Sequence, residues 1–291
     1  MSYLPKDYTP HAKSCGELYA KAMKELAEPF PAVRIDALPR LTALTGGFRT
    51  REFSILCGAT GVGKTCFLAN LSAALLKQRE SHFVASVETG ATDFIKRVIS
   101  VVEHKDLNRG EIVEWEVLKK IHVTHGGHFQ SDCLQLSLYD DRFSVETLMA
   151  DIQWMVKNRG IKIAMIDNLN FFMEITSAQN QVIEMDRVIH ELIIFCKQVD
   201  VHLIMVMHPK KTDSGRVENE FDVKGSSTAI QEAHNVFLFN RAHPELINNN
   251  RAYPTDRELK IQKMRRLGAY VGKRLLLRCN DGVSYLEGDI L

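Results

Sequence analysis

An eight-residue segment, GATGVGKT at residues 58–65, constrains this chain more than any other feature of its sequence. The segment matches the pattern G-x-x-x-x-G-K-[ST] and lies between an apolar stretch and an amphipathic one, as expected for a loop between a strand and a helix. Glycines allow the backbone to wrap around phosphate groups, and the N–H groups at the start of the helix then point at those phosphates. The segment therefore predicts a nucleoside triphosphate site.

Individual residues of this segment have distinct expected roles. Lys64 should reach the β- and γ-phosphates, and Thr65 should offer its hydroxyl to Mg²⁺. The expected cofactors are therefore ATP, or another nucleoside triphosphate, and Mg²⁺. The expected nucleotide-binding residues of the segment are Gly58, Ala59, Thr60, Gly61, Val62, Gly63, Lys64, Thr65 and Cys66.

Apolar segments that read as strands alternate along the chain with segments that have the period of helices. The predicted strands are 53–58, 82–88, 134–141, 161–167 and 201–208. This alternation implies right-handed βαβ units and a mostly parallel central sheet, which is an α/β fold. From residue 235 onward, NVFLFNR, ELKIQKM, RLLLRCN and VSYLEG read as hairpin-linked strands that extend the sheet. Apolar residues at helical spacing predict one further helix over residues 12–28.

We expect neither a membrane span nor secretion, because no apolar run approaches ~18 residues and residues 1–18 show no apolar stretch typical of a secretory signal. The six cysteines form no C-x-x-C pair, which favours reduced thiols in a cytosol-like compartment. The net charge is only +1, so any affinity for nucleic acid depends on a local concentration of charge. Residues 257–278 contain eight Lys or Arg and one acid, which is typical of such a surface or of a solvated strand face.

Two acidic residues are the last residues of predicted core strands and could complete the phosphate site. The carboxyl ends of parallel strands meet at one edge of a sheet, so Asp167 should lie beside Lys64 and Thr65 if its strand neighbours the first one. There it would hold Mg²⁺ through water. Glu88 should lie at the same edge and polarise the attacking water as a general base. The alternatives are an ordinary loop aspartate and a carboxylate that complements a helix dipole.

Taken together, these motifs resemble the RecA-like core of the DnaB-like replicative helicases, a superfamily that includes phage primase-helicases and the mitochondrial helicase Twinkle. The resemblance covers residues 12–291. It is carried, in the family's order, by LTGGFRTREFSILCGATGVGKT, SVETGATDF, IKIAMIDNLNFF, MVMHPKK, VKGSSTAIQEAHNVFLFNR and IQKMRRLG. It implies a RecA-like P-loop NTPase domain over 33–291, extended by antiparallel strands, and an N-terminal segment with a linker helix over 1–32.

The resemblance implies further roles around the nucleotide. His208 occupies the place of the family's γ-phosphate sensor, and Arg241 resembles an arginine that stacks on the nucleotide base. Lys263 and Arg265 resemble a K-x-R pair that reaches the γ-phosphate of the neighbouring subunit, on a strand that the family places at the outer edge of the sheet. We call the arginine that reaches the neighbouring γ-phosphate the finger, and Arg266 is the alternative candidate for it.

The resemblance also implies a loop that faces the central channel of a ring and contacts single-stranded DNA. The residues that match this loop are Lys210, Lys211, Arg216, Lys224 and Gly225. Lysine and arginine would follow the phosphates of one strand electrostatically. The alternative is a solvated loop. In the family, a helix just before the core docks on the adjacent subunit, which gives the 12–28 helix an expected role in holding the ring.

The expected function is therefore that of an ATP-dependent, ring-forming, hexameric DNA helicase or translocase that moves on single-stranded DNA in replication. One alternative is a RecA/RadA-like recombination ATPase, and another is a nucleotide-gated loader or scaffold without unwinding activity. Expected partners are single-stranded DNA, further copies of the chain and a separate primase or loader, with no membrane. The expected location is the cytoplasm of a bacterial or phage system, or the mitochondrion.

Overall fold

A computed structural model of the chain describes residues 13–108, 110–137, 144–168, 178–210, 216–219, 222–223, 227–279 and 281–291. The side chains of 178–182 and 227–229 are outside this description. Contacts within the chain divide it between Pro31 and Ala32 into a short N-terminal unit and a large unit. In the described residues, no helix is long and apolar enough to cross a membrane.

The N-terminal unit contains the helix α1 (Cys15–Ala27). Ser14 caps its start: the Ser14 hydroxyl accepts from the Glu17 N–H, and the Glu17 carboxylate accepts from the Ser14 N–H. This reciprocal capping satisfies two backbone donors that a helix otherwise leaves open. No residue of α1 is buried, although its apolar side chains include Leu18 and Leu26, which are 46% and 76% exposed. The helix therefore presents an uncovered apolar stripe.

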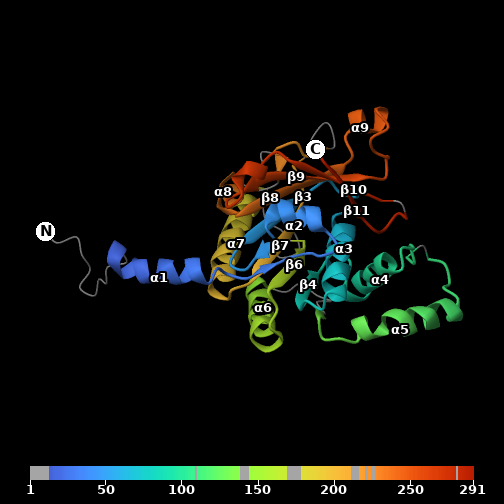
Figure 1. Cartoon of the computed structure of the whole chain (residues 1–291), viewed down its shortest axis with the longest axis horizontal. Helices are drawn as coiled ribbons and strands as arrows, with labels where there is room; N and C mark the ends of the chain where they lie inside the picture. The colour runs from blue at the N-terminus through green and yellow to red at the C-terminus, as the bar shows by residue number, and fades with distance from the viewer. Residues whose placement is uncertain are drawn as a thin grey trace. The chain divides into compact units, whose positions relative to one another are not determined.

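The large unit is built on a nine-stranded sheet in the order β11-β10-β9-β8-β3-β7-β6-β4-β5 (Figure 1). Its strands are β3 (Phe53–Cys57), β4 (His82–Ser86), β5 (Leu134–Leu136), β6 (Ile163–Asp167), β7 (His202–Met207), β8 (Asn235–Arg241), β9 (Arg257–Met264), β10 (Arg274–Arg278) and β11 (Leu286–Ile290). The strands from β8 to β5 in this order are parallel, and β9, β10 and β11 join by antiparallel pairing. A separate two-stranded ribbon pairs β1 (Ala32–Val33) with β2 (Phe48–Arg49).

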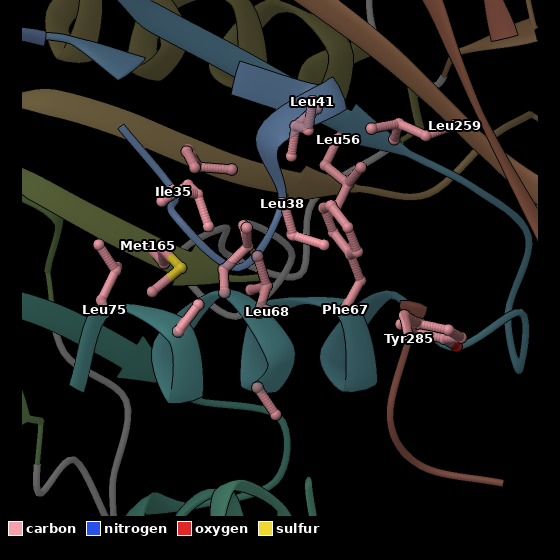
Figure 2. Close-up of a cluster of buried hydrophobic side chains, with 14 of the residues drawn as sticks. Ile35, Leu38, Leu41, Leu56, Phe67, Leu68, Leu75, Met165, Leu259 and Tyr285 are labelled. Atoms are coloured by element: carbon pink, nitrogen blue, oxygen red, sulfur yellow. The ribbon is translucent and has the colours of Figure 1, made fainter. Parts of the chain in front are cut away.

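Helices cover both faces of this sheet and enclose a core on each. They are α2 (Pro39–Thr45), α3 (Lys64–Lys77), α4 (Ala91–Val102), α5 (Trp115–Phe129), α6 (Val145–Arg159), α7 (Ala178–Gln198), α8 (Ser227–Glu232) and α9 (Pro244–Asn248), with the short 3-10 helix η3 (Gly268–Tyr270). One core lies under α2, α3 and α4, and the other lies under α6 and α7. Figure 2 shows Phe67, Leu68 and Leu75 pointing from α3 toward Leu56 of β3 and Met165 of β6. This packing fixes α3, and with it the loop that precedes α3.

Several predicted boundaries and neighbours differ in the structure. β4 ends at Ser86, so Glu88 lies in the turn after the strand. β6 does not neighbour β3, because β7 pairs with both. β8 pairs in parallel with β3, so the antiparallel extension begins only at β9. The predicted strand 134–141 is a strand over Leu134–Leu136, and its residues 138–141 lie outside the described ranges.

Two buried histidines connect the sheet to its surroundings through both ring nitrogens. Nδ1 of His202 donates to the Arg49 carbonyl at 2.6 Å, so Nε2 accepts from the Ser54 hydroxyl at 2.8 Å. His82 repeats this arrangement with the Glu80 carbonyl and the Ser72 hydroxyl. Burial lowers the pKa of each imidazole to about 4. Both side chains are therefore neutral components of the fold at physiological pH.

These histidines predict acid sensitivity. Because the folded-state pKa lies below the ordinary value of 6.5, the stabilisation is complete above pH 6.5 and is lost as the pH falls toward 4. At pH 5.5 each buried histidine should lower the free energy of unfolding by about 1.4 kcal/mol relative to pH 7.5. Urea unfolding at both pH values measures this loss, and His202→Gln should make it smaller by the contribution of one histidine.

The exposed His122 provides the matched control, since it lies on the surface of α5. His122→Gln should keep the full loss of stability between pH 7.5 and pH 5.5. A loss in His202→Gln as large as in the parent chain would show that His202 does not bind its proton mainly in the unfolded state.

Candidate nucleotide-binding site

The phosphate loop connects β3 to α3 and needs its glycines for two different reasons. At Gly58, a Cβ atom would lie 2.4 Å from the Phe239 carbonyl oxygen of the neighbouring strand, so only glycine fits. Gly61 and Gly63 have φ angles of 73° and 100°, values that favour residues without a Cβ atom. Gly63 also lies under the Tyr285 hydroxyl, 2.7 Å from where its Cβ would be. The loop is thus shaped by its own backbone, by β8 and by Tyr285, which lies directly before β11.

Lys64 and Thr65 begin α3 and contact the loop and Asp167. The Lys64 ammonium donates to the carbonyl oxygens of Gly58 at 2.8 Å and Ala59 at 3.0 Å. The Thr65 hydroxyl donates to Oδ2 of Asp167 at 2.6 Å. Burial lowers the pKa of the Lys64 ammonium, an effect that the Asp167 and Glu88 carboxylates oppose. The structure therefore brings together the predicted cation, hydroxyl and carboxylate.

Asp167 has an oxygen that fits a metal ion. Its Oδ1 atom is buried and has no hydrogen-bond partner within the described residues, and the residue as a whole is only 1% exposed. Burial raises the pKa of this carboxyl, and the hydrogen bond from Thr65 opposes that rise. A cation near Oδ1 would stabilise the ionised form. Thr65 and Asp167 are thus suited to hold Mg²⁺, and their role as a metal site stays a prediction.

The route by which Asp167 reaches Thr65 differs from the predicted one. The sequence argument required β6 to lie next to β3, but β7 lies between them. Register brings the strand ends level, because Cys57 pairs with Met207 and Ser86 pairs with Asp167. The first turn of α3 therefore crosses only β7, the single strand between β3 and β6, to reach Asp167.

A second group, formed by Glu88, Asn168 and His208, lies at the same edge of the sheet. The Asn168 side-chain amide donates to the Glu88 carboxylate and lies 3.1 Å from Nε2 of His208. His208 in turn places Nδ1 3.4 Å from the Lys64 ammonium. The Glu88 carboxylate is 40% exposed and can meet a water molecule. The roles of Glu88 as a base and His208 as a sensor stay predictions, but both side chains are linked to Lys64.

A cavity of about 570 Å³ adjoins the phosphate loop. Arg241 lies at the end of β8 and lines it, near Thr60 and Val62 of the loop. Arg216 lines the same cavity and does not lie in a solvated loop: its guanidinium binds the Arg241 carbonyl and forms an ion pair with the buried Glu258. The position of Arg241 is compatible with the predicted base contact, whereas Arg216 is held by the nucleotide side of the domain.

Lys263 and Arg265 lie at the ends of the strands opposite the phosphate loop. The Arg265 N–H donates to the His234 carbonyl, and the His234 N–H donates to the carbonyl of Phe53, the first residue of β3. The five residues of β3, about 16 Å long, therefore separate these strand ends from the phosphate loop of the same chain. Both side chains donate to the Gln231 carbonyl at the end of α8. The predicted outer-edge position is wrong, because β9 lies between β8 and β10.

The predicted DNA-binding residues are only partly described. Lys210 is exposed, and its N–H donates to the Asp222 carbonyl. Lys211, Lys224 and Gly225 lie outside the described residues. In the basic segment 257–278, several charges bind within the domain: Arg274 pairs with Glu258, and Arg278 pairs with the buried Asp256. That segment is therefore not a uniformly free cationic face.

Sequence reasoning assigned no role to three residues that shape the site. Asn168 connects Glu88 to His208, and only its position directly after Asp167 could have indicated this. Arg257 donates from Nε to the Val62 carbonyl of the phosphate loop at 2.7 Å. Tyr285 lies against Gly63, and its N–H donates to the side-chain oxygen of Asn70 at 2.8 Å. The contacts of Arg257 and Tyr285 join residues about two hundred positions apart, so no local pattern reveals them.

Comparison with known proteins gives one family and one fold. The DnaB-like helicase C-terminal domain matches residues 36–275 of this chain. A solved structure of an ATPase domain is similar to 96% of this chain over 100% of its own length, with a TM-score of 0.74 and 16% identity. A DnaB-like replicative helicase, described with its interactions with primase, covers 96% of this chain and 68% of its own, with a TM-score of 0.73 and 16% identity. These matches confirm the predicted RecA-like fold.

The unpartnered oxygen of Asp167 generates a prediction about metal dependence. In the parent chain, Mg²⁺ should strengthen the binding of a nucleoside diphosphate, measured by calorimetry with Mg²⁺ and with chelator. Asp167→Asn removes the negative charge, and because the carboxylate is expected to act through metal-bound water, the Mg²⁺ effect should fall by about 10-fold to 100-fold.

Asp36→Asn is the matched control, because Asp36 is exposed and lies in a different part of the domain. It should keep the whole Mg²⁺ effect. An unchanged Mg²⁺ effect in Asp167→Asn would remove Asp167 from the metal site.

Proposed function

The chain belongs to the DnaB-like helicase C-terminal domain family, and from this premise we propose that it is the ATP-driven motor of a ring-forming DNA helicase. In this proposal, it moves on single-stranded DNA during replication. The observation that carries the proposal is the separation of Arg265 from the phosphate loop of its own chain. Arg265 is too far from Lys64, Asp167 and Glu88 of its own chain to reach them, so in this proposal the next copy provides it.

Within one chain, the proposed chemistry is transfer of the γ-phosphoryl group to water. Lys64 neutralises phosphate charge, and Thr65 and Asp167 hold Mg²⁺, which when bound supplies further charge neutralisation. Glu88 accepts a proton from the attacking water, and the Asn168 amide fixes the orientation of its carboxylate. His208 contacts both Lys64 and Asn168, so it can report the state of the γ-phosphate to the rest of the domain.

Between chains, the proposed finger connects hydrolysis to the ring. Lys263 and Arg265 are held on carbonyl oxygens of Ile230 and Gln231 at the end of α8. The chain enters α8 directly from the loop that resembles the family's channel loop. A shift of that loop on DNA would therefore be transmitted through α8 to the finger. The roles of Lys210, Lys211, Lys224 and Gly225 in contacting DNA belong to this proposal.

Exposed apolar surface supports assembly of several copies. The stripe of α1 is uncovered, and the large unit exposes Ile112, Trp115 and Val123 in and before α5, at 97%, 74% and 77%. Such surface usually marks a contact with another protein. We propose that α1 holds the ring by docking on an adjacent copy. ATP and Mg²⁺ are the proposed cofactors, and a separate primase or loader is a proposed partner.

The proposal predicts a specific recovery of activity in mixed rings. Arg265→Ala should bind nucleotide but hydrolyse ATP about 10³-fold to 10⁵-fold more slowly, and Lys64→Ala should not turn ATP over. When the two variants are mixed, some interfaces combine an intact Arg265 with an intact Lys64. DNA-stimulated ATPase, measured as phosphate release, should therefore partly return.

A mixture of Lys64→Ala with Glu88→Gln is the matched control, since both changes affect the part of the site that one chain provides. Every interface in that mixture keeps a defect, and no activity should return. If co-assembled Arg265→Ala and Lys64→Ala chains stay inactive, either Arg265 is not the finger or hydrolysis requires every site of the ring to be intact. The same mixture with Arg266→Ala in place of Arg265→Ala tests the first of these readings.

If α1 holds the ring together, charge on its apolar stripe should prevent ring formation. Leu18→Asp with Leu26→Asp should shift the chain from rings to monomers in mass photometry with ATP and Mg²⁺, while each monomer still binds nucleotide. Lys24→Asp reverses a charge on the opposite side of the helix and should leave the rings intact. Rings that persist in the Leu18→Asp, Leu26→Asp chain would show that α1 does not hold them.

A further inference from the structure

His234 lies in the short turn between α8 and β8, and its main chain connects two elements of the sheet. The His234 N–H donates to the Phe53 carbonyl at 3.0 Å, and the His234 carbonyl accepts from the Arg265 N–H at 3.0 Å. Phe53 is the first residue of β3. One residue therefore joins the start of the central strand to the arginine that the proposed function assigns as the finger.

The His234 side chain doubles the connection to Phe53. Its Nδ1 atom accepts from the Phe53 N–H at 3.1 Å. Phe53 is fully buried in the core under α6 and α7, so its main chain is a firm point of attachment. A ring nitrogen that accepts a hydrogen bond carries no proton, so the neutral ring has its proton on Nε2. The imidazole thus clamps the turn before β8 to the start of β3.

The surroundings of the ring keep it in this neutral form. Burial lowers the pKa of the His234 imidazole to about 4, and the positive charges of Lys197, Arg265 and Lys263 contribute to this fall. A protonated ring could not accept from the Phe53 N–H and would repel all three cations. His234 is therefore neutral at physiological pH, as its hydrogen bond to Phe53 requires.

Arg265 depends on this turn because it lies just beyond the end of its strand. β9 ends at Met264, so Arg265 is the first residue after it. The Arg265 guanidinium donates to the Gln231 carbonyl at 2.7 Å, a contact that must break before the side chain can reach another chain. The bond from the Arg265 N–H to the His234 carbonyl does not involve the guanidinium. It can persist while the side chain turns outward.

We propose that His234 is the positioning residue for the finger. By clamping its turn to Phe53, it fixes where Arg265 leaves the sheet, and so where the guanidinium meets the γ-phosphate of the next chain. This inference rests on the proposed function. His234 touches neither the nucleotide nor the metal and acts only through Arg265. A displacement of about 1 Å in such a group can cost about 100-fold in rate.

The test compares substitutions of His234 that differ in one hydrogen bond. His234→Ala removes the acceptor for the Phe53 N–H and should lower kcat of the DNA-stimulated ATPase of the full chain by about 10-fold to 100-fold. KM and the affinity for Mg²⁺-ADP, measured by calorimetry, should not change, because the phosphate loop is intact. His234→Asn puts an amide oxygen near the place of Nδ1 and should restore most of the rate. His234→Gln puts its oxygen one carbon further out and should not.

A double-mutant cycle shows whether the effect passes through Arg265. In an Arg265→Ala chain, the added His234→Ala change should lower the single-turnover rate of ATP hydrolysis no further, because no guanidinium is left to position. A general structural role of His234 predicts the opposite, since damage to the start of β3 would slow the Arg265→Ala chain as much as it slows the parent chain.

A parental kcat in His234→Ala overturns the inference and leaves the proposed helicase intact. A loss that is equally large in the Arg265→Ala background, or that appears as weaker nucleotide binding, also overturns it. If His234→Ala does not fold, the difference in kcat between His234→Asn and His234→Gln decides in its place. If Arg265→Ala itself hydrolyses ATP at the parental rate, the proposed finger fails, and the positioning role of His234 fails with it.

Discussion

The parallel pairing of β3, β7, β6 and β4 is the constraint on which the site depends. Their register places the carboxyl ends of all four strands level with one another. Glu88, Asp167 and His208, and the phosphate loop that leads to Lys64, therefore lie at the same ends of the strands. Apolar packing on both faces holds this register, because a shift of one residue would turn buried side chains to the opposite face. The hydrogen bond from Thr65 to Asp167 is a consequence of that alignment.

The antiparallel extension also contributes contacts to the proposed nucleotide site. Arg257 at the start of β9 binds the Val62 carbonyl, and Tyr285 before β11 lies against Gly63. Arg216 joins the end of β8 to the buried carboxylate of Glu258. Strands that appear only to widen the sheet thus shape the phosphate loop and the cavity beside it. The proposed nucleotide site is therefore built from segments far apart in the sequence.

The two ends of the central strands carry different functional side chains, and this difference supports the proposed multi-subunit motor. The carboxyl ends of the parallel strands carry the phosphate loop and its acidic partners. The opposite ends carry Lys263 and Arg265, held on carbonyls at the end of α8. Within one chain, the five residues of β3 keep these two ends about 16 Å apart. Copies arranged head to tail could bring them together, since each would present one end of its sheet to the next copy, as in the ring that we propose.

Much of this architecture was predictable from local sequence, and the remainder required the fold. The phosphate loop, the strand ending in Asp167 and the capped helix α1 are encoded by residues that are close in sequence, so pattern and spacing identify them. The position of β7 between β3 and β6, the parallel pairing of β8 with β3 and the capture of Arg216 by Glu258 are not. Strand order and buried ion pairs depend on which distant surfaces pack best together, and only the tertiary structure decides that.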